Sequence, residues 1–185
     1  MSLLDIYVLG APILREETRP VAEFGPEFQK LVDDMFETMY AAKGIGLAAP
    51  QVGRTERVAV IDVDGAKHVI VNPEIVRREG SQKGEEGCLS IPDIYAEVDR
   101  AMHVVVRAQD REGQPIEIDA AELLARCLQH EIDHLHGKLF IDYLSLLKRR
   151  AALKKWEKAR AGDKSLTRMV APLEVAQHHH RDEEL

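Results

Sequence analysis

Two histidines lie four residues apart around a glutamate in the stretch QHEIDHLHG, residues 129–137. At ~100° per residue, His130 and His134 fall one turn apart on one helix face, so both imidazoles can bind the same divalent ion. Glu131 lies at the edge of that face, where its carboxylate can take up and release a proton. Since chance alone produces HExxH in on the order of one chain in a hundred, the motif requires a third ligand and a cavity.

The third ligand has one candidate downstream of the motif and one upstream. Downstream, Glu157 is a conceivable third ligand for a zinc peptidase of the HExxH class. It lies among basic residues in KKWEKAR, where a glutamate more often forms an ion pair on a helix surface. Cys88 in EEGCLSIP offers a soft thiolate, and Gly87 before it lets the backbone approach another group closely. Two histidines and one thiolate leave a fourth position for a water, whose pKa the ion lowers toward neutrality as in a hydrolase.

The stretch KGIGLAAPQVG, residues 43–53, is a candidate for the substrate side of such a site. Gly44 and Gly46 permit close backbone approach, and Gln51 presents an amide donor for a developing oxyanion. A Gly-x-Gly pair also occurs in phosphate-binding loops. Because neither GxGxxG nor GxxxxGK[ST] is present, phosphate binding is the weaker interpretation.

Two helices flank these motifs in the pattern of apolar residues. The first is predicted from about Pro26 to Ala42, where apolar residues recur at helical spacing. The second covers about 120–136, with Asp119 as its N-cap and Gly137 just past its end. Its histidine face includes two further residues, Leu123 and Cys127. Its narrow solvent side is expected to hold Glu122, Arg126, Gln129 and Asp133.

Short β-rich runs lie between the two helices. They cover residues 57–63, 68–72, 102–110 and 114–119, and glycines or Asn72-Pro73 separate them. The pattern predicts hairpin-like antiparallel strands. The expected fold is therefore α+β: antiparallel β-sheets around a central HExxH helix, with an N-terminal amphipathic helix and a basic C-terminal one, LLKRRAALKKWEKAR.

Composition limits the function classes. The 185 residues are 45% hydrophobic and 31% charged, which is typical of a globular protein. We expect one domain of residues 1–161, because the basic helical segment ends there, and a tail of residues 162–185. The net charge of −7 argues against specific DNA binding. No apolar run approaches the ~20 residues of a membrane span. Two cysteines and no export signal predict a reducing compartment, the cytoplasm.

Three stretches together, GIGLAAPQ, EEGCLS and QHEIDHLHGKLFIDYL, resemble the bacterial peptide deformylase family over roughly residues 3–155. The resemblance implies an enzyme that removes the N-formyl group from the N-terminal formylmethionine of newly made chains, with a metal-bound hydroxide as the attacking group. It also implies Fe²⁺ as the native ion, which Zn²⁺, Ni²⁺ or Co²⁺ can replace in purified protein.

Matching motif positions assigns roles in this chain. The resemblance makes Glu131 the general acid/base, and it places Gln51 and the backbone N–H of Leu89 at the oxyanion. The implied metal ligands are Cys88, His130 and His134. The implied substrate-binding residues, along the peptide backbone and in the methionine pocket, are Ile45, Gly46, Gly87, Leu123 and Cys127.

Some features lie outside these assignments. Arg126 stands where an apolar residue is expected in some relatives, and it either rims the pocket or faces water. His178, His179 and His180 in the tail inherit no role. The basic helix could dock on the ribosome, and a non-enzymatic alternative is a ribosome-associated module with a structural metal, which a fourth protein ligand would support.

Overall fold

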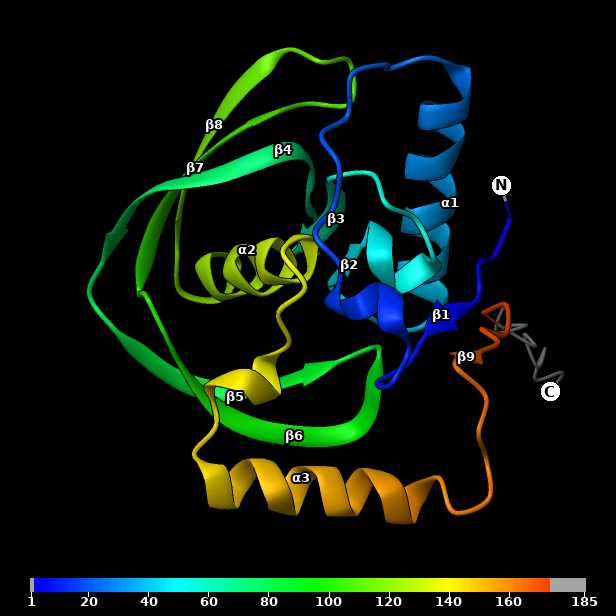
Figure 1. The fold of residues 1–185 in the computed structure, drawn as a ribbon. Coiled ribbons are helices and arrows are strands. Elements are labelled where there is room, and N and C mark those ends of the chain that lie inside the picture. The colour runs from blue at the N-terminus through cyan, green and yellow to red at the C-terminus, as the bar shows by residue number, and fades with distance from the viewer. Residues whose placement is uncertain (1, 174–185) are drawn as a thin grey trace, which may run out of the picture.

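The structure is a computed structural model that describes residues 2–173. Within that range, three α-helices combine with antiparallel sheets, and helix α2 (Glu122–Leu135) lies in the middle of the molecule (Figure 1). The predicted α+β architecture around a central HExxH helix is confirmed. None of the helices described is long and apolar enough to cross a membrane.

The largest sheet has five antiparallel strands in the order β2-β3-β4-β7-β8. Its strands are β2 (Gly46–Ala48), β3 (Val58–Val63), β4 (Ala66–Glu79), β7 (His103–Gln109) and β8 (Pro115–Ala121). Asp64 and Gly65 both have positive φ in the β3–β4 turn, as a two-residue hairpin loop requires. The predicted break at Asn72-Pro73 is wrong, because β4 continues through it with a register shift. This bulge lets one long strand pair with β3 in its first half and with β7 in its second.

Helix α2 packs its apolar face on this sheet. Leu128 and Leu135 are fully buried against a cluster that includes Ile61 from β3. The predicted solvent side of α2 is wrong in part, since Arg126 and Gln129 are only 7% and 6% exposed. A second sheet covers that side of the helix, and helical periodicity alone cannot reveal such a partner.

Helix α2 also begins differently from the prediction. Asp119 is a strand residue of β8, and the N-cap position is Ala121, which has no capping side chain. The β7–β8 pairing extends to His103 opposite Ala121, and the Glu122 N–H then donates to the carbonyl of Met102. The strand ladder therefore occupies the residues that the capping motif would need.

The second sheet is the hairpin of β5 (Gln82–Cys88) and β6 (Ile91–Arg100), which the strand prediction did not include. Helix α3 (Leu146–Ala159) lies against it and buries Trp156 with the short 3-10 helix Phe140–Tyr143. The N-terminal helix α1 (Pro26–Ala41) packs on the opposite part of the molecule, against β2 and β3 (Figure 1). The hairpin and the five-stranded sheet thus enclose α2 from two sides.

The two ends of the described chain meet in a small third sheet. Strand β1 (Ile6–Tyr7) pairs with β9 (Thr167–Arg168), so the residues after α3 return to the body of the protein (Figure 1). The division expected at residue 161 remains a prediction. The tail histidines at 178–180 lie outside the described residues.

Candidate metal centre and substrate cavity

Cys88 ends strand β5, and two histidines face it from α2. The Sγ atom of Cys88 lies 3.3 Å from Nε2 of His134, which is 3.2 Å from Nε2 of His130. All three potential ligand atoms lie within 4.8 Å of one another, and no further His, Cys, Asp or Glu between residues 2 and 173 joins the group. Glu157 is exposed on α3 and is not one of these potential ligands. The arrangement can hold one metal ion and leave a coordination position open.

The donor atoms fit a divalent metal ion. Nδ1 of His130 is bonded to a carboxylate oxygen of Glu86 at 3.0 Å, which leaves the Nε2 lone pair directed at the group. Burial lowers the pKa of His134 well below its usual value and keeps that ring neutral, as a metal ligand must be. Imidazole and thiolate donors together suit Fe²⁺, Co²⁺, Ni²⁺ and Zn²⁺.

Glu86 is the anion that fixes His130, and it is 6% exposed. It accepts hydrogen bonds from Arg100 at 2.7 and 3.0 Å and from Arg126 at 2.9 Å. Burial alone would raise the pKa of Glu86, but the bonds from His130 and Arg100 outweigh it and lower the pKa to about 2. Arg126 also donates to the carbonyl of Val98, so it does not face water: it is buried, it lines the cavity, and it holds Glu86.

Glu131 lies beside the metal-ligand group with one oxygen, Oε2, that has no hydrogen-bond partner among the described residues. Burial raises the pKa of Glu131 to about 7, although His130 acts in the opposite direction. Its carboxylate is packed so closely on β2 that a Cβ built on Gly46 would come within 2.8 Å of its carboxyl carbon. This approach explains why glycine stands at residue 46.

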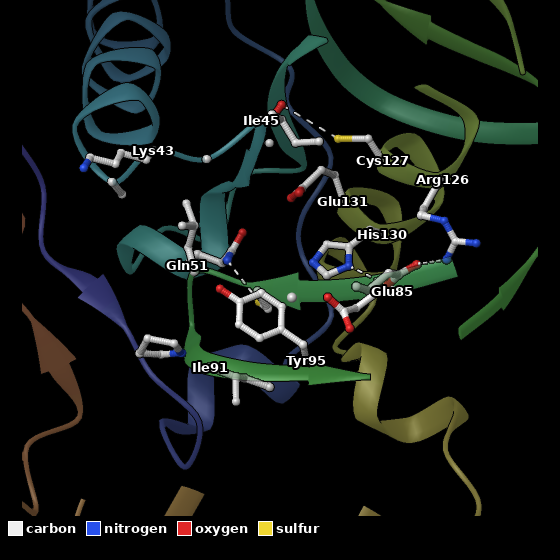
Figure 2. Close-up of a pocket in the computed structure, with 18 of the residues that line it drawn as sticks. Lys43, Ile45, Gln51, Glu85, Ile91, Tyr95, Arg126, Cys127, His130 and Glu131 are labelled. Carbon is white, nitrogen blue, oxygen red and sulfur yellow. Dashed lines mark hydrogen bonds and ion pairs between the residues drawn. The ribbon is translucent and has the colours of Figure 1, made fainter. Parts of the chain in front are cut away.

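Gln51 points its amide nitrogen at the same space, as Figure 2 shows together with His130 and Glu131. Its Oε1 accepts from the backbone N–H of Ala48 at 2.9 Å, which fixes the orientation of the amide. Nε2 lies 3.1 Å from Oγ of Ser90 and 3.6 Å from Sγ of Cys88. The side chain thus presents N–H groups beside the candidate metal position.

A cavity of about 460 Å³ opens over these groups. Apolar side chains form part of its wall: Ile45 is 44% exposed, Leu123 is 46% exposed, and the buried Cys127 has its Sγ 3.8 Å from the carbonyl of Ile45. Of the residues expected at the site, only His134 does not line the cavity, because it lies behind the other ligands at 1% exposure. The lining residues that the motifs suggested are Gly44, Ile45, Gly46, Gln51, Gly87, Cys88, Leu89, Leu123, Cys127, His130 and Glu131.

Several residues at the cavity were given no role from the sequence. The sequence could have indicated Glu86, because it lies two residues before Cys88 and alternation in a strand places both side chains on the same face. Tyr95 lies so close to Gly87 that a Cβ there would come within 2.6 Å of its ring. The contacts of Arg126 and Arg168 depend on tertiary pairings that no local pattern shows.

Comparison with known proteins gives a consistent result. A family model described as polypeptide deformylase matches residues 3–150. The chain is 55% identical to a peptide deformylase of Alkalilimnicola ehrlichii over 162 residues, covering 85% of this chain and 91% of the relative. A peptide deformylase of Hydrogenovibrio crunogenus is 53% identical over 164 residues, covering 87% of this chain and 97% of the relative.

Solved structures agree with the sequence relatives. The crystal structure of a peptide deformylase from Legionella pneumophila superposes with a TM-score of 0.83 at 51% identity, covering 86% of this chain and 96% of that one. One from Synechococcus elongatus, in complex with actinonin, gives 0.80 at 42% identity, covering 82% and 86%. The chain therefore belongs to the peptide deformylase family.

Proposed function

We propose that this protein is a metal-dependent hydrolase that removes the N-formyl group from the N-terminal formylmethionine of newly synthesised proteins and releases formate. The observation that carries the proposal is the group of Cys88, His130 and His134, with Glu131 beside it at an open cavity. Family membership supports the same reaction.

Cys88, His130 and His134 would hold the ion, which we propose to be Fe²⁺, replaceable by Zn²⁺, Ni²⁺ or Co²⁺. When bound, the ion supplies Lewis acidity, because it polarises the formyl carbonyl and makes water a stronger acid. Glu86 keeps the His130 ring oriented through its bond to Nδ1. The buried ion pairs of Glu86 with Arg100 and Arg126 hold that carboxylate in place.

The other polar groups carry out proton transfer and charge stabilisation. Glu131, with its pKa raised to about 7, takes the proton from the attacking water and passes it to the departing amine nitrogen. The amide of Gln51 and the backbone N–H of Leu89 donate to the formyl oxygen as negative charge develops on it. A formyl carbon carries only hydrogen, so a tight site excludes bulkier acyl groups by steric contact.

The peptide itself would lie along the unpaired edge of β2, beside Ile45 and Gly46, with Gly87 on the facing hairpin. Main-chain bonding to a strand edge in this way is β-augmentation, in which main-chain hydrogen bonds give affinity and side-chain pockets give specificity. The methionine side chain would fill the apolar space between Ile45, Leu123 and Cys127.

Formate release from formyl-Met-Ala-Ser tests the reaction, and an unblocked Met-Ala-Ser peptide is the matched substrate. We expect formate from the first peptide and no cleavage of the second. Peptide-bond cleavage without formate would support the HExxH peptidase instead. Metal binding without either activity would support the module with a structural metal.

We further propose that the protein works in the cytoplasm and contacts the ribosome through α3. Basic side chains crowd this helix, and five of them are exposed: Lys148, Arg150, Lys154, Lys155 and Lys158. Contacts between such basic side chains and the phosphates of ribosomal RNA weaken as the salt concentration rises. The fraction of the protein that sediments with purified ribosomes should fall as the salt concentration rises. It should also fall in the double variant Lys154→Glu/Lys155→Glu. Sedimentation that does not depend on salt would argue against this contact.

A further inference from the structure

The segment after α3 reaches the substrate cavity. Strand β9 pairs with β1, with Arg168 opposite Ile6, and the N–H of Val8 donates to the carbonyl of Leu166 at 2.9 Å. This pairing places Arg168 on the wall of the cavity, where it is half-buried. Because Arg168 lies outside residues 3–150, the family match assigns it no role.

Arg168 bonds to the turn that carries the proposed oxyanion donor. Its Nε donates to the carbonyl of Leu89 at 3.0 Å, and within residues 2–173 this is the only side-chain hydrogen bond that Arg168 makes. Leu89 and Ser90 form the two-residue turn between β5 and β6. The position of the Leu89 N–H relative to Cys88 therefore depends on how this turn is held.

The rest of the turn is anchored from the other end of the chain. The carbonyl of Ser90 accepts from the N–H of Leu9 at 2.9 Å, and Oγ of Ser90 lies 3.1 Å from Nε2 of Gln51. The side chain of Leu89 rests on Gly44, where a Cβ would come within 2.6 Å of its Cδ1. Each polar anchor thus fixes a different group, and Arg168 is the one that fixes the Leu89 carbonyl.

We propose that Arg168 is a positioning residue for deformylation: it holds Leu89 so that its N–H points at the oxyanion, and β9 is thereby part of the active site. This inference rests on the proposed function. A guanidinium is suited to the task because its planar donors bond a carbonyl in a fixed direction. Burial lowers the pKa of Arg168, while Cys88 and Asp93 oppose that change.

Substitution of Arg168 should therefore change the chemical step more than substrate binding. Small misplacements of a catalytic donor cost large factors in rate, so Arg168→Ala should lower kcat about tenfold with KM nearly unchanged. Arg168→Lys, which retains a donor, should recover part of the loss. Met169→Ala is the control, because Met169 is the next residue, is 86% exposed and does not line the cavity.

The experiment measures formate release from formyl-Met-Ala-Ser at matched metal content, with melting temperatures for all four proteins. Loss of kcat in Arg168→Ala alone, partly recovered in Arg168→Lys, supports the proposal. An unchanged kcat, an effect confined to KM, or an equal loss in Met169→Ala overturns it. If the wild-type chain releases no formate at all, the proposed function fails first, and the two failures are therefore distinguishable.

Discussion

Glu131 and Glu86 have the same functional group, yet their surroundings move their pKa values in opposite directions. Burial without a full set of donors raises the pKa of Glu131 to about 7. Glu86 is also buried, but bonds from His130 and Arg100 lower its pKa to about 2. One carboxylate can therefore exchange protons near neutral pH, while the other remains an anion that orients a ligand.

At the residue scale, Glu131→Gln should separate catalysis from metal binding. The substitution keeps the volume of the side chain but removes its ability to carry a proton, so formate release should fall by about 10² to 10⁴. Metal content should stay near that of the wild type, since no ligand is lost. Atomic absorption together with the formate assay measures both quantities.

Glu157→Gln is the matched control for that variant. Glu157 is exposed on α3, and its substitution should leave both metal content and activity unchanged. A loss of metal in Glu157→Gln would indicate that Glu157 is a metal ligand, as in the HExxH peptidase alternative. Near-normal activity in Glu131→Gln would remove Glu131 from the proton-transfer role.

At the scale of elements, the sequence predicted the parts with a strong local period and missed those defined by a partner. Helices α1 and α2 follow from 3.6-residue spacing, and β3 and β7 from apolar runs. The β5–β6 hairpin was missed because two charged residues, Glu86 and Arg100, occupy buried positions where the alternation would require apolar ones. The same hairpin buries Arg126 and Gln129, which reversed the expected solvent side of α2.

The three motifs gave the candidate ligands because each is contiguous in sequence. The cluster of Cys88 with His130 and His134 then required the fold to bring β5 onto α2. Glu86 lies within EEGCLS and Arg168 lies outside all three motifs, but the contacts of both depend on hydrogen bonds between segments 44 and 79 residues apart. Local pattern therefore suggested the candidate reacting groups, and tertiary structure showed which side chains are bonded to them.

Strand β2 packs closely on α2 at Gly46. The variant Gly46→Ala tests whether activity depends on this close packing. The added methyl would meet the Glu131 carboxylate, so we expect kcat to fall by about 10² because that group must move. Gly25→Ala is the control, since nothing lies within 4 Å of its Cβ position and its φ of −73° suits alanine. Equal activity of the two variants would show that Glu131 tolerates displacement.

Asp142 connects the 3-10 helices Pro12–Arg15 and Phe140–Tyr143. Its carboxylate accepts from Arg15 at 2.6 and 3.1 Å and from the N–H of Leu139 at 3.0 Å. Burial opposes ionisation, but these bonds outweigh it and hold the pKa of Asp142 below its usual value. Because the folded-state pKa lies below the unfolded value of about 3.9, this group stabilises the fold above that pH, and the effect is lost as pH falls through the folded-state pKa.

Asp142→Asn should therefore lower the free energy of unfolding by about 1 kcal/mol near pH 7, a modest value because both partners are partly exposed. Urea denaturation near pH 7 and again near pH 3 should show the difference from wild type narrowing at the lower pH. Asp64→Asn, in the exposed β3–β4 turn, is the control and should change neither value. A difference that is the same at both pH values would assign the effect to packing.

At the scale of the whole molecule, the metal-ligand group joins two parts that fold from distant segments. Cys88 belongs to the β5–β6 hairpin, while His130 and His134 belong to α2 on the five-stranded sheet. An ion held by all three would bind the folded chain and not the separated segments. Metal binding is therefore expected to raise the stability of the whole chain.

Metal removal should lower the melting temperature of the protein. At a free metal concentration of about 1,000 times Kd, binding contributes about 4 kcal/mol, which corresponds to roughly 10 °C for a chain of this size. Thermal unfolding with Ni²⁺ and after treatment with a chelator measures this shift without any activity assay.

Cys88→Ser should reduce the shift to less than half, because a hydroxyl binds these ions more weakly than a thiolate does. Cys127→Ser, a buried cysteine outside the ligand group, should keep the full shift. A shift equal in all three proteins would mean that the ion binds elsewhere, and then the cluster of Cys88, His130 and His134 would not be the metal site.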